Sequence, residues 1–490
     1  MPVELSSESI PPDKPRRPLA ELLFLALPTV AQMASYTVMQ FADSLQLAVG
    51  AGDAAATAAG MGGFMVFTAM SWMWGALLVV NTLVSQALGA GNQEAGGRYL
   101  WQGVWFAAAA GLMLLPTMLI SGPVLAAFGH SPEVVELGRR YYDIEIAWAP
   151  VRLAGLAVAQ FLLAVGRPRV TLLAALCATS LDVLMNFVFI TGRFGMPALG
   201  VAGAAWSTNA AVTLELAIMS TFAARHAIRH TYQLWRWRPH WPSMRQLIAI
   251  GVPGGFQTVA EVVAWFLFCV WVMNQFGQAA VTANNYMMQY MKVSFMPAFG
   301  LSSAVTALVG RYLGMGRLDL ARHRAHLGFK VTAAYMLLCG ACFFLGRNQL
   351  IGLFSDDPDV IRIGGILLTF AAVYQLFDGL YIIYIGALRG AGDTFWPATV
   401  TAVLCWTIVV IGGASTGRLA PQWGPTGPWV AASLYGLILG LYLFARFSRG
   451  QWKAIDTTRA GPADADADRS GGEAAGVSKP LIPSTTVEPA

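Results

Sequence analysis

Three carboxylate residues in this sequence each have an amide or a phenol four positions away. The pairs are Asp182 with Asn186, Gln257 with Glu261, and Tyr374 with Asp378. Residues four apart in an α-helix lie on the same face, so each pair would direct its oxygens toward one point. Clustered oxygens bind a dehydrated cation, and a buried carboxyl group near another negative charge can also hold a proton. The spacing therefore indicates cation or proton sites without choosing between them.

These residues lie in long apolar segments. Of the 490 residues, 56% are hydrophobic and 12% are charged, whereas roughly a quarter of the residues in soluble domains are charged. Apolar runs of about 20 residues recur, each long enough to cross a bilayer as a helix. The sequence therefore predicts an all-α integral membrane protein with about twelve spans. The predicted spans are 19–41, 60–83, 100–120, 144–165, 170–190, 201–223, 247–273, 282–309, 327–345, 366–388, 397–414 and 429–447.

Several ionisable residues fall inside these spans. The acidic residues well inside them are Asp182, Glu215, Glu261 and Asp378. Asp43 directly follows the first span, and Arg152 and Lys292 are basic residues within later ones. A charged side chain at the bilayer centre costs at least about 2.5 kcal/mol, so each is expected to face protein or water. A purely structural hydrogen bond or salt bridge between helices is the alternative for each carboxylate, and the favoured interpretation for Glu215, which has no polar partner of this kind in its own helix.

The chain contains an internal duplication. Equivalent residues 225 positions apart are Pro28 and Pro253, Gln32 and Gln257, Gly52 and Gly277, Val84 and Val309, Gly89 and Gly314, and Gly91 and Gly316. Further along the spacing becomes 226, as for Pro132 and Pro358. An even number of crossings separates equivalent positions, which predicts two six-helix bundles of the same orientation related by a pseudo-twofold axis along the membrane normal. The predicted parts are an N-terminal segment 1–18, a first bundle 19–223, a linker 224–245, a second bundle 246–447 and a disordered tail 448–490.

Basic residues concentrate in alternate connections between the spans. The linker alone carries Arg225, Arg229, Arg236, Arg238 and Arg245. The bias is roughly fourfold, which predicts that the linker and both termini are cytoplasmic. The same rule explains this basic run without a nucleic-acid partner. The polar, Pro-rich residues 1–18 do not read as a cleavable signal peptide, so the N-terminus is expected to be retained.

The cysteines and histidines do not indicate an enzyme. All five cysteines lie in apolar spans, and the pair Cys339 and Cys342 has no further metal ligands nearby in the sequence. All six histidines lie outside the predicted spans or at their edges. A catalytic metal would require such ligands clustered at depth. We therefore expect no enzymatic activity and no cofactor beyond a coupling ion.

Four motifs resemble the multidrug and toxic compound extrusion (MATE) family in its NorM-like and DinF-like branches. The first is a proline followed fifteen residues later by an aspartate, Pro28 and Asp43. The others are TLVSQALGAGNQEAG at 82–96, RFGMPALGVAGAAWST at 193–208 and GALRGAGDT at 386–394. The motifs occur in family order, and the resemblance covers roughly residues 19–447. It implies two lobes in a V-shaped arrangement around a central cavity that opens alternately to each side of the membrane.

The resemblance also implies an activity and two coupling sites. Family members export bulky, often cationic amphiphiles in exchange for Na+ or H+. The residues that match the N-lobe site are Asp43, Asp182, Asn186 and Thr208, although here Asp precedes Asn, whereas some members have the reverse order or two Asn. The residues that match the C-lobe site are Glu261, Tyr374 and Asp378. Of these, Glu261 and Asp378 are the candidate Na+ ligands.

Lys292 departs from the family pattern. If its ammonium reached Glu261 or Asp378, it would replace a bound cation; alternatively it would bind an anionic part of a substrate. With Gln257, Trp265 and Met287 it is a candidate lining residue of the substrate cavity. A flippase for lipid-linked precursors of the same superfamily is therefore the alternative function, and a membrane-embedded enzyme is disfavoured by the duplication. The expected setting is a monomer in the bacterial inner membrane whose partners are amphiphilic small molecules and lipid.

Overall fold

The computed structural model describes residues 17–127, 129 and 131–454, all within one compact unit. Most of the predicted N-terminal segment and tail, residues 1–16 and 455–490, lie outside the described residues. Regular secondary structure within the described residues is helical throughout. The first half contains α1 (Pro18–Ala51), α2 (Asp53–Leu77), α3 (Val79–Gly89), α4 (Gln93–Leu114), α5 (Ser121–Ala126), α6 (Pro132–Ala147), α7 (Ala149–Ala164), α8 (Pro168–Phe189) and α9 (Val201–Ala223).

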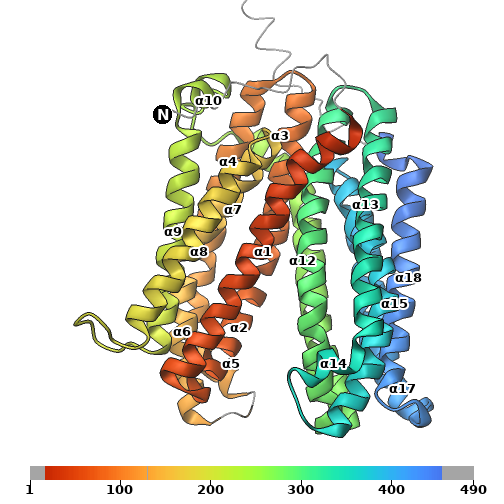
Figure 1. The fold of residues 1–490 in the computed structure, drawn as a ribbon. Helices are drawn as coiled ribbons and strands as arrows, with labels where there is room; N and C mark the ends of the chain where they lie inside the picture. The colour runs from red at the N-terminus through yellow and green to blue at the C-terminus, as the bar shows by residue number, and fades with distance from the viewer. Residues whose placement is uncertain (1–16, 128, 130, 455–490) are drawn as a thin grey trace, which may run out of the picture. The chain divides into compact units, whose positions relative to one another are not determined.

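The second half follows a short linker helix, α10 (His226–Thr231). It contains α11 (Trp241–Leu267), α12 (Gln278–Gly314), α13 (Leu318–Leu345), α14 (Arg347–Gly352), α15 (Pro358–Gly390), α16 (Phe395–Leu404), α17 (Gly413–Leu419) and α18 (Thr426–Arg449). A π-helical segment, Cys405–Gly412, joins α16 to α17, and another, Phe268–Val272, continues α11. Figure 1 shows the long helices running side by side along one common direction.

Ten helical segments of the described chain are long and apolar enough to cross a membrane, or eleven if the bent pair α6 and α7 counts as one span. This pair corrects the fourth predicted span. The span predicted at 144–165 is instead part of a longer segment that begins at Pro132 and bends by 51° between α6 and α7. The remaining predicted span is α9, which is long enough but carries Asn209 and Glu215 in its interior. The predicted all-α membrane fold of two related bundles is confirmed.

Proline and glycine mark the helix boundaries. Proline, which has no N–H to lose at the first position of a helix, begins α1, α6, α8 and α15. Gly52 ends α1 with φ 87° and ψ 171°, and its repeat partner Gly277 has the same two angles at the start of α12. Only glycine adopts this left-handed region without strain. The duplicated halves therefore share backbone conformation at an irregular point as well as in their helices.

The pseudo-twofold axis passes between Gly89 of α3 and Gly314 of α12. A Cβ atom on Gly89 would lie 2.1 Å from the Arg311 carbonyl oxygen, and one on Gly314 would lie 2.1 Å from the Gln86 carbonyl oxygen. Gln86 and Arg311 are themselves 225 positions apart, so the two contacts are reciprocal. Neither position has room for a side chain, because two helix backbones touch there.

The halves meet through equivalent helix pairs, α1 on α12 and α2 on α11. The Thr29 hydroxyl donates to the Gly300 carbonyl at 3.0 Å, and the side chain of Gln86 donates to the Gly390 carbonyl at 2.8 Å. Glu21 of α1 forms a buried ion pair with Arg324 of α13 at 2.7 Å. Figure 1 shows α1 and α12 close together at the end where α1 begins and farther apart at the opposite end.

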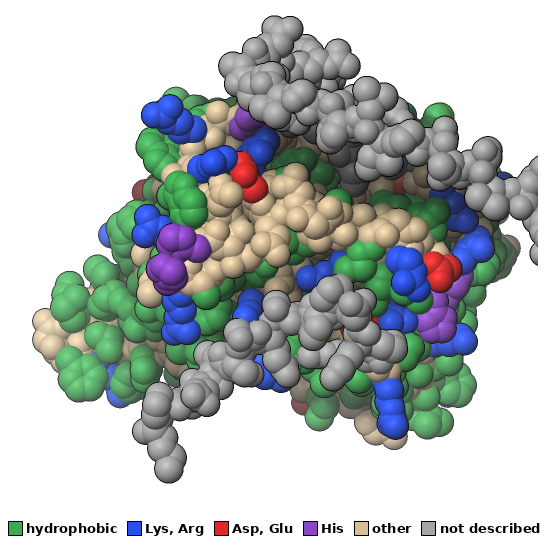
Figure 2. Space-filling view, turned by 90° about the horizontal axis from the view of Figure 1, so that it is seen from above, with side chains coloured by type: hydrophobic (Ala, Val, Ile, Leu, Met, Phe, Trp, Pro, Cys, Tyr) green, Lys and Arg blue, Asp and Glu red, His purple; other side chains and the backbone are tan. Residues whose placement is uncertain are grey.

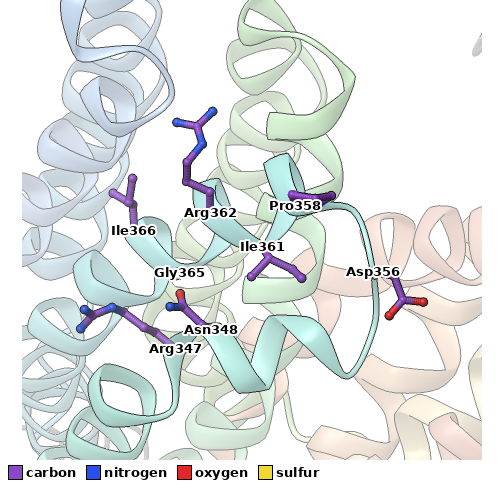
Figure 3. Close-up of a pocket in the computed structure, with 8 residues that line it drawn as sticks. All are labelled: Arg347, Asn348, Asp356, Pro358, Ile361, Arg362, Gly365 and Ile366. Carbon is purple, nitrogen blue, oxygen red and sulfur yellow. The ribbon is translucent and has the colours of Figure 1, made fainter.

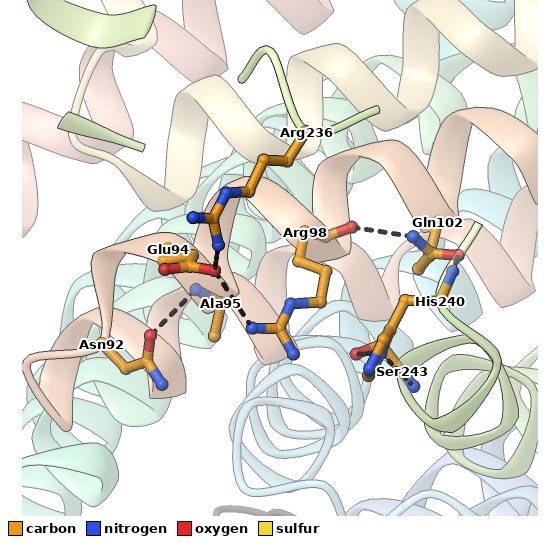
Figure 4. Close-up of polar contacts among 8 residues, drawn as sticks. All are labelled: Asn92, Glu94, Ala95, Arg98, Gln102, Arg236, His240 and Ser243. Carbon is orange, nitrogen blue, oxygen red and sulfur yellow. Dashed lines mark hydrogen bonds and ion pairs between the residues drawn. The ribbon is translucent and has the colours of Figure 1, made fainter. Parts of the chain in front are cut away.

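The linker between the halves is fastened to α4 (Figure 4). Glu94 forms ion pairs with Arg98, at 3.5 Å, and with Arg236 of the linker. The Gln102 side chain accepts a hydrogen bond from the His240 backbone at 3.0 Å. The backbone of the linker also lies directly on Gly97, where a Cβ atom would be 1.9 Å from the Tyr232 carbonyl oxygen. The linker therefore packs as part of the first half.

Candidate functional site

The structure brings the four predicted residues of the first half together. Asn186 of α8 donates from its side-chain amide to Asp43 of α1 at 2.6 Å and to Asp182 at 3.2 Å. Thr208 of α9 lies beside Asp182 and donates to the Ala204 carbonyl at 3.1 Å. Asp182 and Asn186 are fully buried, and Oδ1 of each has no hydrogen-bond partner among the described residues. The cluster therefore offers unused oxygens to a cation or a proton. Its role in coupling stays a prediction.

A buried ion pair adjoins this cluster. Glu145, which is 2% exposed, accepts a hydrogen bond from Arg152. Arg152 also donates to the side-chain oxygen of Asn209 at 3.3 Å, and the Asn209 amide donates to the Ile144 carbonyl at 2.9 Å. The pair thus joins α6, α7 and α9 at the bend. Sequence reasoning missed Glu145 because it stood at the edge of the predicted span. The signal in the sequence that could have identified this pair is the opposite charge of Glu145 and Arg152, seven positions apart.

Glu215 has a partner from another helix. The Tyr36 hydroxyl of α1 donates to Glu215 Oε1 at 2.5 Å, and the Gln32 amide donates to the Tyr36 hydroxyl at 2.9 Å. The partner of Glu215 lies 179 positions away in the sequence. No pattern within α9 could identify it.

In the second half, Glu261 of α11 is surrounded by neutral donors. Its Oε2 accepts from the Tyr381 hydroxyl at 2.7 Å and from the Gln257 amide at 3.4 Å, and its Oε1 accepts from the Tyr435 hydroxyl at 3.1 Å. Gln257 also donates to the Tyr381 hydroxyl at 3.2 Å. Tyr381 and Tyr435 were not predicted, because aromatic residues in apolar spans are usually packing residues. No cation forms an ion pair with Glu261 within 4.0 Å in the described chain.

Tyr374 and Asp378 lie near Glu261 but do not bond to each other. Both are buried, with 5% and 7% of their surface exposed. The Asp378 carboxylate interacts electrostatically with Glu261, and it has no hydrogen-bond partner among the residues that the structure describes. The Tyr374 ring packs edge-on against Trp265, with 6.2 Å between ring centroids. The three predicted C-lobe residues therefore share one region, where Asp378 is left without a neutralising partner.

The four predicted cavity residues have different environments. Gln257 is buried in the Glu261 network, and Trp265 is partly buried among aromatic rings. Met287 is fully buried in the hydrophobic core of the second half. Lys292 is exposed, and the described residues include no carboxylate within ion-pairing distance of its ammonium. The structure therefore does not show Lys292 replacing a cation at either carboxylate of the second half, and cavity lining by these residues stays a prediction.

A separate cavity of about 510 Å³ lies between α14 and the start of α15 (Figure 3). None of the predicted site residues lines it. The lining residues are Arg347, Asn348, Asp356, Pro358, Ile361, Arg362, Gly365 and Ile366. The cavity is therefore distinct from the buried carboxylates.

The fold and these carboxylates define a multi-pass membrane protein of two duplicated helical bundles. The MatE family model matches residues 28–188 and 256–413, and the chain belongs to this family, whose members are transporters and not enzymes. The resemblance predicted from the four motifs is therefore confirmed.

Curated relatives and solved structures are similar over most of the chain. A probable multidrug resistance protein NorM of Pseudomonas putida is 30% identical, covering 87% of this chain and 92% of the relative. Multidrug resistance protein PmpM of Pseudomonas aeruginosa is 28% identical, with 87% and 89% covered. The crystal structure of the eukaryotic MATE transporter AtDTX14 superposes with a TM-score of 0.81 at 16% identity, covering 89% of this chain and 97% of that one. At that identity the superposition supports the fold alone.

Proposed function

We propose that this protein is a secondary antiporter that exports organic, often cationic and amphiphilic compounds in exchange for Na+ or H+ by alternating access. Relatives named multidrug resistance proteins support the class of substrate. The observation that carries the proposed exchange is the environment of Glu261 and Asp378. Both lie at depth in spanning helices, and no described cation pairs with them within 4.0 Å.

A buried carboxylate without a counter-charge is costly in a membrane. Three neutral hydrogen bonds to Glu261 reduce that cost, and Arg389 interacts with it electrostatically without forming an ion pair within 4.0 Å. A bound proton, Na+ or substrate cation would supply the counter-charge. A coupling ion and a substrate cation would compete for the negative charge of this region. Exchange follows if the region binds one of them at a time.

The proposed orientation places the termini and the linker in the cytoplasm of a bacterial cell, with the protein in the inner membrane as a monomer. Figure 2 shows Lys, Arg and His side chains around the end of the bundle where α3 and α10 lie, with few carboxylates among them. This pattern is typical of the cytoplasmic face. The contacts of Glu21 with Arg324 and with the Tyr312 hydroxyl, at 2.8 Å, then lie on the cytoplasmic side. An inward-open state would require these contacts between the halves to break.

Dye efflux from proteoliposomes tests the proposal. The protein is reconstituted with ethidium inside, and an inward gradient of Na+ or of protons is imposed in separate experiments. One gradient should accelerate efflux in the wild type and leave the Glu261→Gln, Asp378→Asn double variant at its rate without a gradient. The matched control is Asp393→Asn, because Asp393 is a buried carboxylate held by Arg446 at 2.7 Å. Equal acceleration of the wild type and the double variant would refute the role of these carboxylates.

A further inference from the structure

Each half contains one pair of a carboxylate and a phenol. The helix that supplies the phenol in the first half corresponds to the helix that supplies the carboxylate in the second half. Residues 36 and 261 are equivalent in the repeat, 225 positions apart. In the first half the first helix supplies the phenol, since Tyr36 donates to Glu215 of α9 at 2.5 Å. In the second half the first helix supplies the acid, since Glu261 accepts from Tyr435 of α18 at 3.1 Å.

The surrounding residues confirm that these two pairs correspond. Gln32 and Gln257 are also 225 positions apart, and each donates to its partner one helical turn further on. The last helices, α9 and α18, follow Gly200 and Gly424, which both have positive φ, 55° and 52°. With that alignment, Tyr435 corresponds to a position one turn from Glu215. Both pairs therefore lie at the same depth of their bundles.

Glu215 is a buried carboxylate whose direct hydrogen-bond donors are neutral. Its side chain is 9% exposed, Oε1 accepts from the Tyr36 hydroxyl, and the Gln32 amide also lies beside the carboxylate. Tyr36 of α1 and Arg152 of α7 are the titratable and charged groups that interact with it. The guanidinium of Arg152 is itself bound to Glu145 of α6, and the nearest acid on α8 is Asp182. The fifth helix that packs against α9 is α2, and its one charged residue is Asp53, at its first position.

The chemistry of this pair fits a proton better than a metal cation. The oxygens at the point of contact are the two of Glu215 and the hydroxyl of Tyr36, because Gln32 directs its amide N–H toward that hydroxyl. Three oxygens cannot replace the hydration shell of Na+, whereas one carboxylate oxygen is sufficient to hold a proton. We propose that Glu215 is a proton-binding site of the first half, with Tyr36 as its hydrogen-bonding partner. This inference deepens the proposed cation exchange and rests on it.

The position of Glu215 suits a second site along the same bundle. Tyr36 precedes Asp43 by seven residues in α1, and Glu215 follows Thr208 by seven residues in α9. At about 1.5 Å per residue, the Tyr36 and Glu215 pair lies roughly 10 Å from the Asp43 cluster, toward the end where α1 begins. In the second half the residues equivalent to Asp43 and Thr208 are apolar, Phe268 and Ala432. At these equivalent positions of the described chain, the first half therefore has carboxylates at both depths and the second half does not.

Infrared difference spectroscopy of the purified protein in lipid tests this assignment without a substrate. The spectrum at alkaline pH is subtracted from the spectrum at acid pH. A carboxyl group that is protonated at acid pH contributes a C=O stretching band to the difference. The wild type should show a band that is missing in Glu215→Gln. Tyr36→Phe should retain the band at a shifted frequency, since the hydrogen bond is lost but the carboxyl group remains. Asp393→Asn, which alters a buried carboxylate bound to Arg446, should leave the band unchanged.

Identical difference spectra for the wild type, Glu215→Gln and Tyr36→Phe would overturn the inference. If Glu215→Gln does not fold, the frequency in Tyr36→Phe decides alone, and an unshifted spectrum contradicts the proposal. The result is separable from the proposed function. Gradient-driven ethidium efflux without a Glu215 band would refute only the proton site, whereas a Glu215 band in a protein that exchanges no cation for dye would refute only the antiport.

Discussion

The two halves have similar backbones but hold their buried charges differently. Equivalent glycines have the same dihedral angles, and equivalent helices form the contact between the halves. Yet Arg152 of the first half corresponds to Asp378 of the second, 226 positions later. Arg152 is neutralised by Glu145, whereas Asp378 has no described hydrogen-bond partner. The duplication therefore fixed the scaffold, and subsequent changes of charge gave the halves unequal electrostatic roles.

The largest expected effect separates coupling in the two halves. Replacing Glu261 by Gln and Asp378 by Asn should reduce gradient-driven ethidium efflux by about 5–150-fold, the range of typical coupling energies. The reason is that two buried carboxylates of the second half, neither in an ion pair within 4.0 Å among the described residues, lose their charge at nearly constant shape. Asp43→Asn with Asp182→Asn is the matched pair in the first half. If only the Asp43→Asn, Asp182→Asn variant lost its gradient dependence, the second half would not carry the coupling ion.

A second prediction concerns stability. Arg152→Met should lower the free energy of unfolding by about 3–5 kcal/mol, because it leaves Glu145 buried without its cation. Adding Glu145→Leu should restore most of that loss. Asp378→Asn, at the equivalent position, should cause little destabilisation, since no ion pair is broken there. Thermal unfolding in detergent measures all three, and equal losses for Arg152→Met and Asp378→Asn would remove the contrast between the halves.

A third prediction tests what the halves share. Gly89→Ala and Gly314→Ala should each destabilise the protein by about 1–3 kcal/mol, because the added methyl group meets a backbone carbonyl. The two losses should be similar, since the contacts are reciprocal. Gly155→Ala is the control, because a Cβ atom there meets no heavy atom within 4 Å. A loss at one glycine alone would show that the axis is placed wrongly.

The smallest expected effect is at Lys292. Lys292→Gln should change the gradient dependence of efflux by less than about twofold, because no described carboxylate lies within ion-pairing distance of its ammonium. A large loss of coupling would show that Lys292 reaches Glu261 or Asp378 in another conformation. A gain in lipid translocation by the wild type over Lys292→Gln, measured with a fluorescent lipid, would support the flippase alternative.

Much of the fold follows from patterns within single helices. Apolar length predicted the spans, and the spacing of repeated prolines and glycines predicted the duplication, because these features depend on local sequence. The four residues of the first-half cluster were also predicted, through the family motifs and the spacing of Asp182 and Asn186. The structure shows them in contact, and their role stays a prediction.

The contacts between helices were not predictable in the same way. Glu215 has no polar partner in α9, so its bond to Tyr36 arises only from the packing of α1 against α9. Tyr381 and Tyr435 have the composition of packing residues, and their hydroxyl groups acquire a function only when Glu261 lies between them. Glu145 was missed because the charged sequence of α6 placed it at the edge of the predicted apolar span. For Glu215 and Glu261 the missing information was the tertiary partner.

We propose that buried carboxylates in the two halves carry a cation in exchange for an organic compound. The most direct measurement is ion movement driven by the dye alone, in proteoliposomes with an ethidium gradient and no imposed ion gradient. Outward dye movement should drive net inward movement of protons or Na+, and the Glu261→Gln, Asp378→Asn variant should lose this movement. Dye transport by the wild type with no counter-movement of either ion would contradict the account.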